Sequence, residues 1–161
     1  MTFFDTGIRV SELINLKLSQ VKDEYILIHG KGDKERVVPK SPLLNKWMFK
    51  YLSTRENFFA YRRVPENVFL SRNGRPMTTE AIHRVIKIAG KAVGVSKDIR
   101  VSPHTCRHTF AQMQLKNGLD LYSLSRLMGH SNISITQRYL EGLRDFEVLN
   151  ACKATGIMMN L

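Results

Sequence analysis

Apolar residues recur with a helical period in several stretches of the chain. Residues 9–16, 43–61 and 80–93 each carry hydrophobic side chains at every third or fourth position, which is the pattern of an amphipathic helix. In the middle stretch this spacing includes Trp47, so we expect its indole in the core rather than stacked on a base. In the last stretch the positions expected to face inward are Ile82, Val85, Ile86 and Ala89.

Other stretches have the composition of strands. Residues 25–29 and 36–39 are rich in β-branched and aromatic side chains, and residues 30–33 between them supply turn-forming glycines. We therefore predict an antiparallel hairpin with Lys31 at its mouth, and a further short strand at 68–70. Together the patterns predict an α+β fold that is mainly α-helical, with a small antiparallel sheet.

Residues 101–139 contain three predicted helices in close succession. Pro103 suits the first turn of the first helix, and the Asn-Gly pair at 117–118 is a stop signal. Asp120 then caps a second short helix, which Gly129 closes.

Polar side chains lie at the ends of these helices. His130 follows the closing glycine at once, and Tyr139 falls in the last turn of a third helix that Ser131 or Asn132 can cap. A single histidine or tyrosine at such a place is equally well explained by packing. Any assignment of chemistry therefore depends on the whole set of polar residues.

Length and charge narrow the class of protein. The chain has 161 residues, of which 43% are apolar, and this suits one domain without internal repeats or linkers. Lys and Arg total 25 against 14 acidic residues, a net charge of +11, and residues 61–116 alone carry 11 basic and 3 acidic groups. This excess predicts a polyanionic partner that faces the middle of the chain.

Cysteine usage and the N-terminus indicate a compartment. Cys106 and Cys152 are too few for a disulfide framework and fit a reducing cytoplasm. No apolar run reaches membrane-spanning length, and residues 1–5 lack the basic start of a signal peptide. We expect a cytoplasmic protein, bacterial or phage-encoded, with no membrane partner.

Five motifs occur in a fixed order. They are Thr-Gly-Ile-Arg-Val-Ser-Glu-Leu from Thr6, Gly-Lys-Gly-Asp-Lys-Glu-Arg from Gly30, His-Thr-Cys-Arg from His104, Gly-His at 129–130, and Tyr139. The series resembles the tyrosine recombinases, the phage-integrase family that cuts and rejoins DNA, and it covers essentially the whole chain. The resemblance implies that the chain is the catalytic domain of this family. It would come from the integrase of a mobile element, such as a phage or transposon, or from a site-specific recombinase.

The resemblance assigns the nucleophile to Tyr139. It implies attack on DNA that leaves a covalent 3′-phosphotyrosine and a free 5′-hydroxyl, with no cofactor and no metal. The residue types fit this chemistry, because Arg9 and Arg107 can each make two parallel hydrogen bonds to phosphate oxygens. His104 and His130 can donate hydrogen bonds nearby, where negative charge builds up during the attack.

Further residues have supporting roles. Glu12, three residues after Arg9 on the same side of its helix, can hold the guanidinium in place. Lys31 is placed to protonate the leaving 5′-oxygen, since the glycines of the turn let the backbone approach a ligand. The expected contacts to backbone phosphates are Lys34, Arg36, Arg84, Lys87 and Lys91.

The resemblance also predicts how the chain is organised. We interpret residues 1–161 as one catalytic domain truncated at its N-terminus, because residues 1–7 are too short for a helix of their own and the family has an upstream DNA-clamping domain. The apolar stretch 143–161 predicts either a tail that docks on a neighbouring protomer or a segment that folds back on its own domain. The implied partners are double-stranded DNA at specific sites, a homotetramer on DNA, and accessory DNA-bending proteins.

Three alternatives compete with this interpretation. His104 and His108 have the i, i+4 spacing of zinc-binding helices, although position 105 is not Glu and Cys106 points to another face. The same set of catalytic residues also resembles that of the type IB topoisomerases, which would nick and close DNA. A non-catalytic DNA-binding remnant is the third alternative.

Overall fold

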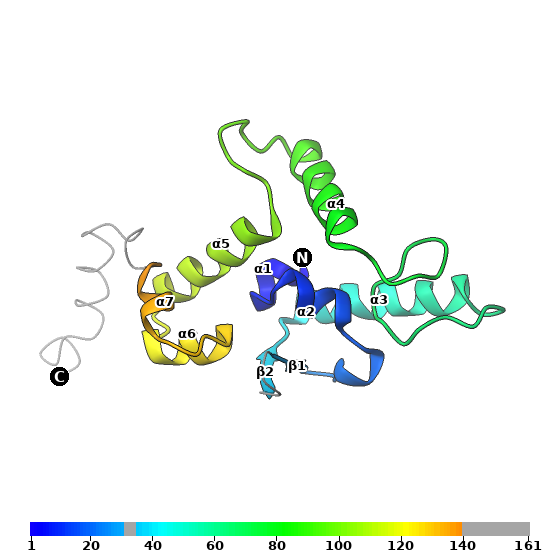
Figure 1. Ribbon diagram of the computed structural model, residues 1–161, viewed down its shortest axis with the longest axis horizontal. Coiled ribbons are helices and arrows are strands. Elements are labelled where there is room, and N and C mark those ends of the chain that lie inside the picture. The colour runs from blue at the N-terminus through cyan, green and yellow to red at the C-terminus, as the bar shows by residue number, and fades with distance from the viewer. Residues whose placement is uncertain (31–34, 140–161) are drawn as a thin grey trace, which may run out of the picture.

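The computed structural model describes residues 1–30 and 35–139. Within them the predicted mainly helical fold with a small antiparallel sheet is confirmed, and Figure 1 shows the arrangement of its elements. The elements are α1 (Thr2–Thr6), α2 (Val10–Asn15), the 3₁₀ helix η1 (Leu18–Gln20), β1 (Tyr25–His29), β2 (Glu35–Pro39), α3 (Pro42–Phe58), α4 (Thr79–Ala92), α5 (Pro103–Lys116), α6 (Leu121–Met128) and α7 (Ser134–Gln137). Lys31, Lys34 and the stretch 143–161 lie outside the described residues.

The predicted hairpin is confirmed. β1 and β2 pair antiparallel from Tyr25 opposite Pro39 to His29 opposite Glu35, so the second strand begins one residue earlier than expected. The strand predicted at 68–70 is wrong: Leu70 forms only an isolated bridge with Pro76. With so short a partner segment, no ladder of backbone hydrogen bonds develops there.

Two hydrophobic clusters hold the described elements together. The larger one joins α2, the hairpin, α3 and α4, and its buried members include Leu13, Ile26, Ile28, Val38, Leu44, Met48 and Ile82. The smaller one joins α5, α6 and the segment after α7 through Phe110, Ala111, Leu124, Met128 and Tyr139. Leu127 of α6 packs against both clusters.

Three predicted core positions are wrong. Trp47 is 47% exposed, because α3 turns Leu44 and Met48 into the core and leaves the indole at the edge of that stripe, beside Lys50. On α4 only one side is covered, so Ile82 is buried whereas Val85 and Ala89 are exposed. Helical spacing identifies an apolar stripe, and its neighbours decide how much of it is covered.

Residues 2–6 form the short helix α1. α1 is stable at this length because it lies against α5, and Gly7 ends it with φ +60°. A Cβ at Gly7 would come within 2.3 Å of the Phe110 ring, so a glycine is required where α1 meets α5. This close approach brings the Gly7 carbonyl to α5.

The three helices that follow residue 101 have the predicted starts and stops, with one difference. Pro103 lies in the first turn of α5, Asp120 caps α6 by accepting from the Ser123 amide, and Gly129 ends α6 with φ +66°. The third helix is shorter than expected: α7 begins after Ile133, so neither Ser131 nor Asn132 is its N-cap, and Tyr139 lies just beyond its end. Of the helices in residues 1–30 and 35–139, none is long and apolar enough to cross a bilayer.

Candidate active site

Three arginines from different elements converge on the last turn of α6. The carbonyl of Leu127 accepts from Arg36 Nε at 2.9 Å, that of Met128 from Arg107 Nη2 at 2.7 Å, and that of Gly129 from Arg9 Nη2 at 2.9 Å. These carbonyls have no partner within the helix, and they lie at the negative end of its dipole. The convergence places three cations directly before His130.

Arg9 lies at the start of α2 and faces the solvent. Its Nη1 pairs with Glu12 Oε1 at 3.0 Å, and its backbone amide donates to Oε2 at 2.7 Å, so the contact expected from their spacing is present. The Arg9 side chain is 39% exposed, whereas Glu12 is buried. Burial raises the pKa of Glu12, but hydrogen bonds from Arg36 and Arg9 outweigh it and lower this pKa to about 2.

Arg107 is buried in α5 behind Arg9. Its guanidinium donates to the carbonyls of Gly7 and Met128, and its Nη2 lies 3.1 Å from His130 Nε2. Burial, followed by the nearby charge of Arg9, lowers the pKa of Arg107 to about 10. The guanidinium therefore keeps its charge at neutral pH and is fixed in direction by three acceptors.

His130 is held between Arg107 and Thr136. An arginine can only donate, so Nε2 of His130 accepts, and the proton sits on Nδ1, which donates to the buried Thr136 Oγ1 at 2.8 Å. Burial and the charges of Arg107 and Arg9 lower the pKa of His130 to about 4. The imidazole is neutral at pH 7, and it can donate from Nε2 only after Arg107 moves to another acceptor and the tautomer changes.

Tyr139 lies beside these groups and is mostly covered. Its ring stacks on His130 at 6.3 Å between centroids and meets the edge of His108 at 5.1 Å. Only 8% of the residue is exposed, although the predicted role of nucleophile requires its hydroxyl to reach a phosphate.

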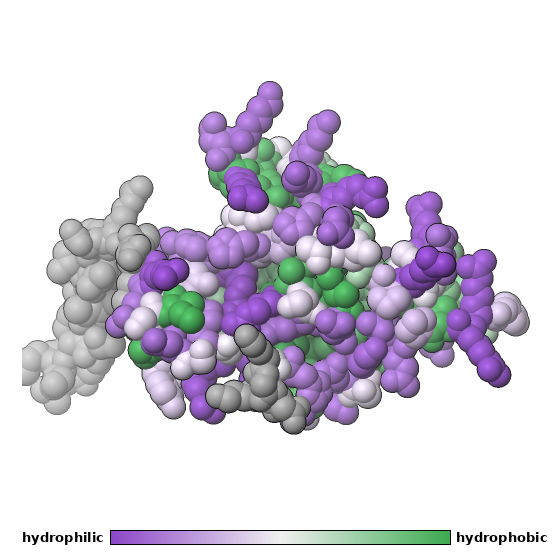
Figure 2. Space-filling model, viewed as in Figure 1, coloured by the Kyte–Doolittle hydropathy of each residue, from purple (hydrophilic) through white to green (hydrophobic). Residues whose placement is uncertain are grey.

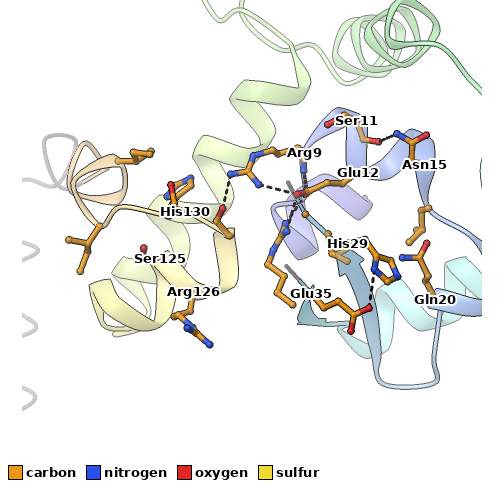
Figure 3. Close-up of a pocket in the computed structure, with 18 of the residues that line it drawn as sticks. Arg9, Ser11, Glu12, Asn15, Gln20, His29, Glu35, Ser125, Arg126 and His130 are labelled. Atoms are coloured by element: carbon orange, nitrogen blue, oxygen red, sulfur yellow. Dashed lines mark hydrogen bonds and ion pairs between the residues drawn. The ribbon is translucent and has the colours of Figure 1, made fainter. Parts of the chain in front are cut away.

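An open cleft of about 1350 Å³ gives solvent access to this site. Figure 3 shows Arg9 and Glu12 on one side of it and His130, Ser125 and Arg126 of the α6 region on the other. The hairpin contributes His29 and Glu35, whose Nδ1 and Oε1 atoms lie 3.0 Å apart at the end of the paired strands.

The remaining predicted residues are distributed around this centre. His104 is exposed in the first turn of α5, three residues before Arg107. Arg84, Lys87 and Lys91 are exposed on α4, and Figure 2 shows long hydrophilic side chains extending from that part of the molecule. Cys106 is buried, and among the described residues no three His, Cys, Asp or Glu side chains group closely enough to hold a metal ion.

Arg36 does not have the exposed position expected of a phosphate contact. All three of its guanidinium nitrogens are bonded inside the protein, to Glu12 and to the Leu127 carbonyl. These contacts favour a positioning role over the predicted contact with DNA.

Sequence reasoning also missed Thr136, whose only signal was its place three residues before Tyr139.

Comparison with known proteins decides the family. The model of the phage integrase family matches residues 1–144. The chain belongs to this family. Among its members, the tyrosine recombinase XerD of Lacticaseibacillus casei is 41% identical over 138 residues, and XerD of Staphylococcus aureus (strain Mu50 / ATCC 700699) is 39% identical over the same length. Each alignment covers 84% of this chain and 46% of the relative, so the chain spans about half the length of the curated relatives it matches.

Solved structures of the family have the same fold. The crystal structure of XerA recombinase superposes with a TM-score of 0.82 and 32% identity, over 96% of this chain and 56% of XerA. The catalytic domain of bacteriophage HP1 integrase gives a TM-score of 0.61 at 24% identity, over 98% of this chain and 80% of that domain. The predicted fold, that of a tyrosine-recombinase catalytic domain, is thereby confirmed.

Proposed function

We propose that this integrase-family chain is the catalytic part of a tyrosine recombinase, which cuts DNA at specific sites and rejoins it. The observation that carries the proposal is the convergence of Arg9, Arg107, His130 and Tyr139 around the C-terminal end of α6. The family match and the identity to recombinases named XerD support it.

The arginines provide the electrostatic part of the reaction. Attack on a phosphodiester builds negative charge on the non-bridging oxygens, and donors that are already fixed in place stabilise this charge without reorganising. Arg9 reaches the cleft, and Arg107 is held behind it by the carbonyls of Gly7 and Met128. Two guanidinium groups can therefore bind the phosphate in the place where other enzymes use a metal ion.

Tyr139 is the nucleophile in this proposal. Its oxygen forms a bond to phosphorus as the bond from phosphorus to the 5′-oxygen breaks, which leaves a 3′-phosphotyrosine. The phenol gives its proton to a water molecule, and Lys31 of the hairpin donates a proton to the 5′-oxygen. The reverse steps rejoin DNA, so no nucleotide cofactor is needed. Because Tyr139 is mostly covered in the free chain, its hydroxyl must become accessible when DNA binds.

The substrate in this proposal is double-stranded DNA at specific sites. The enzyme works in the cytoplasm of a bacterium, either for a mobile element or as a resident site-specific recombinase. His104, exposed in the first turn of α5, donates to the phosphate, and Lys34, Arg84, Lys87 and Lys91 contact the backbone. In this proposal four copies of the protein assemble on DNA, and accessory DNA-bending proteins assist them. Residues 143–161 are the segment exchanged between protomers, and an upstream domain completes the DNA clamp.

A trapping experiment tests the proposal. Nicked duplexes from the DNA that flanks the gene are incubated with the chain, so that the downstream fragment diffuses away and rejoining stops. We expect an adduct that resists denaturant, is destroyed by protease and joins the protein to a DNA 3′ end. Tyr139→Phe should abolish it, whereas Tyr122→Phe, which alters a tyrosine that lines the cleft, should retain it.

Other results would favour other functions. Linkage through Tyr122 or to a 5′ end would refute the assignment of the nucleophile. Absence of any adduct from a chain that binds the DNA would favour the non-catalytic regulator. An adduct accompanied by relaxation of supercoiled DNA, without strand exchange between two sites, would favour the nicking and closing activity of a topoisomerase.

A further inference from the structure

Arg36 of β2 contacts two parts of the site that are distant from it in sequence. Its Nη1 and Nη2 make a bidentate pair with Glu12 of α2, at 2.9 and 2.7 Å, and its Nε donates to the Leu127 carbonyl of α6 at 2.9 Å. The side chain of Arg36 is only 11% exposed, and that of Glu12 is 6% exposed. Arg36 thus joins the hairpin, α2 and α6 at the wall of the cleft.

The Glu12 carboxylate is fully occupied by this arrangement. Oε1 accepts from Arg9 Nη1 and Arg36 Nη1, and Oε2 accepts from the Arg9 amide and Arg36 Nη2. An ionised carboxylate has about four acceptor positions, so each has a donor here. Planar bidentate pairing also fixes the orientation of the carboxylate. The fixed carboxylate in turn orients the Arg9 guanidinium through its hydrogen bond with Nη1.

Arg36 also fixes the turn before His130. It binds the first of the three carbonyls that end α6, whereas Arg107 and Arg9 bind the second and third. Its guanidinium lies so close to Gly129 that a Cβ there would come within 2.9 Å of Nη1. Both ends of the Arg9 guanidinium, at Glu12 and at Gly129, therefore depend on groups that Arg36 touches.

We propose that Arg36 is a positioning residue for the reaction, which orients Arg9 through Glu12 and through the turn at Gly129 without contacting DNA. The inference rests on the proposed function, because it concerns the arginine that binds the scissile phosphate. It also links the hairpin that carries Lys31 to the clamp, since the contacts of Arg36 start in β2. A lysine cannot replace it, because a single ammonium cannot make the bidentate pair and the carbonyl contact together.

The first test combines two substitutions. Arg36→Gln should lower the single-turnover rate of adduct formation by about a hundredfold, the loss expected when a catalytic group is displaced by about 1 Å. Arg36→Gln added to Arg9→Ala should cause little further loss, because both changes remove the same positioned group. If the two losses instead multiply in full, Arg36 does not act through Arg9 and the proposal is overturned.

Salt dependence separates positioning from binding. Loss of one phosphate contact reduces the slope of log affinity against log salt by about 0.9 for duplex DNA. We expect Lys87→Ala on α4 to show this change and Arg36→Gln, which also removes a charge, to keep the slope of the unaltered chain while cleaving more slowly. A reduced slope for Arg36→Gln with an unchanged rate at saturating DNA would show that Arg36 is a phosphate contact and overturn the proposal.

A spectroscopic readout keeps the inference independent of catalysis. The Arg9 Nε–H signal, identified by its loss in Arg9→Lys, should shift in Arg36→Lys and stay in place in Lys46→Gln, which alters an exposed cation on α3. An unshifted Arg9 signal in Arg36→Lys would overturn the proposal. A shifted signal in a chain that forms no adduct with any DNA would leave Arg36 as the group that positions Arg9 and reject the proposed function instead. If Arg36→Gln fails to fold, Arg36→Lys, which keeps a cation beside Glu12, decides the rate comparison.

Discussion

Arg9 and Arg107 differ in how they are held, and this difference gives a prediction at the scale of single residues. Arg9→Ala removes a half-exposed group, so we expect cleavage to fall by about a hundredfold or more, the scale of one lost oxyanion donor, with little change in stability. Arg107→Ala should lower cleavage at least as far and should also destabilise the fold, by about 1–3 kcal/mol for each buried acceptor left unpaired.

Single-turnover cleavage and thermal unfolding of the two variants provide the measurements. Wild-type rates in both variants would remove the arginine clamp from the mechanism. Equal destabilisation by the two substitutions would contradict the structural distinction between a solvent-facing and a buried guanidinium.

His130 predicts a pH dependence of stability. Burial and the charges of Arg107 and Arg9 lower its pKa from 6.5 to about 4, so the unfolded chain takes up a proton at a higher pH than the folded one. The stabilisation is present above pH 6.5 and is lost as the pH falls to 4. The lowered pKa of Glu12 acts in a separate window, from its ordinary 4.5 to about 2.

The measurement is the unfolding midpoint at a series of pH values. The midpoint of the unaltered chain should drop more steeply between pH 6.5 and 4 than that of His130→Gln, whose amide still offers an acceptor to Arg107 and does not titrate. Parallel curves for the two proteins over this interval would show that His130 is not held neutral in the fold.

At the scale of elements, the end of α6 depends on Gly129 for two reasons. Its φ of +66° costs an alanine about 1–2 kcal/mol, and a Cβ would press on the Arg36 guanidinium. Gly94 ends α4 with φ +73°, and nothing lies within 4 Å of a Cβ placed there. Gly94→Ala should therefore show the backbone cost alone, while Gly129→Ala should exceed it by about 1–3 kcal/mol of overpacking.

Denaturant unfolding of the two alanine variants gives the comparison. Cleavage should fall in Gly129→Ala and remain normal in Gly94→Ala, because only the first substitution displaces a group that positions Arg9. Equal losses of stability in Gly129→Ala and Gly94→Ala would mean that the close approach of Arg36 to Gly129 adds nothing to the free energy lost.

At the scale of the whole molecule, the net charge of +11 and the fixed guanidinium groups predict catalysis that needs no divalent metal. Cleavage should proceed at an unchanged rate in excess EDTA, since Arg9 and Arg107 supply the positive charge at the phosphate. A magnesium-dependent nuclease in the same buffer serves as the control and should stop. Loss of cleavage on chelation, with recovery on added zinc or magnesium, would refute the mechanism.

Much of the local structure could be predicted from the sequence because it depends on adjacent residues. The Asp120 cap, the glycine stop at Gly129 and the hairpin of β1 and β2 arise from hydrogen bonds and backbone preferences within a few positions. Where the outcome depended on packing, prediction was weaker: Trp47 and Val85 follow the helical period, yet the neighbours of α3 and α4 leave both exposed.

The sequence by itself determined the helices, the hairpin and the motifs that carry the reactive groups, because these depend on short-range interactions. Only the tertiary structure decided how those groups meet. Arg9 and the Gly129 carbonyl are 120 positions apart, and the Gly7 carbonyl is 100 positions from Arg107. The burial of Tyr139, the proton on Nδ1 of His130 and the inward orientation of Arg36 all follow from such contacts, which exist only once distant segments have packed together.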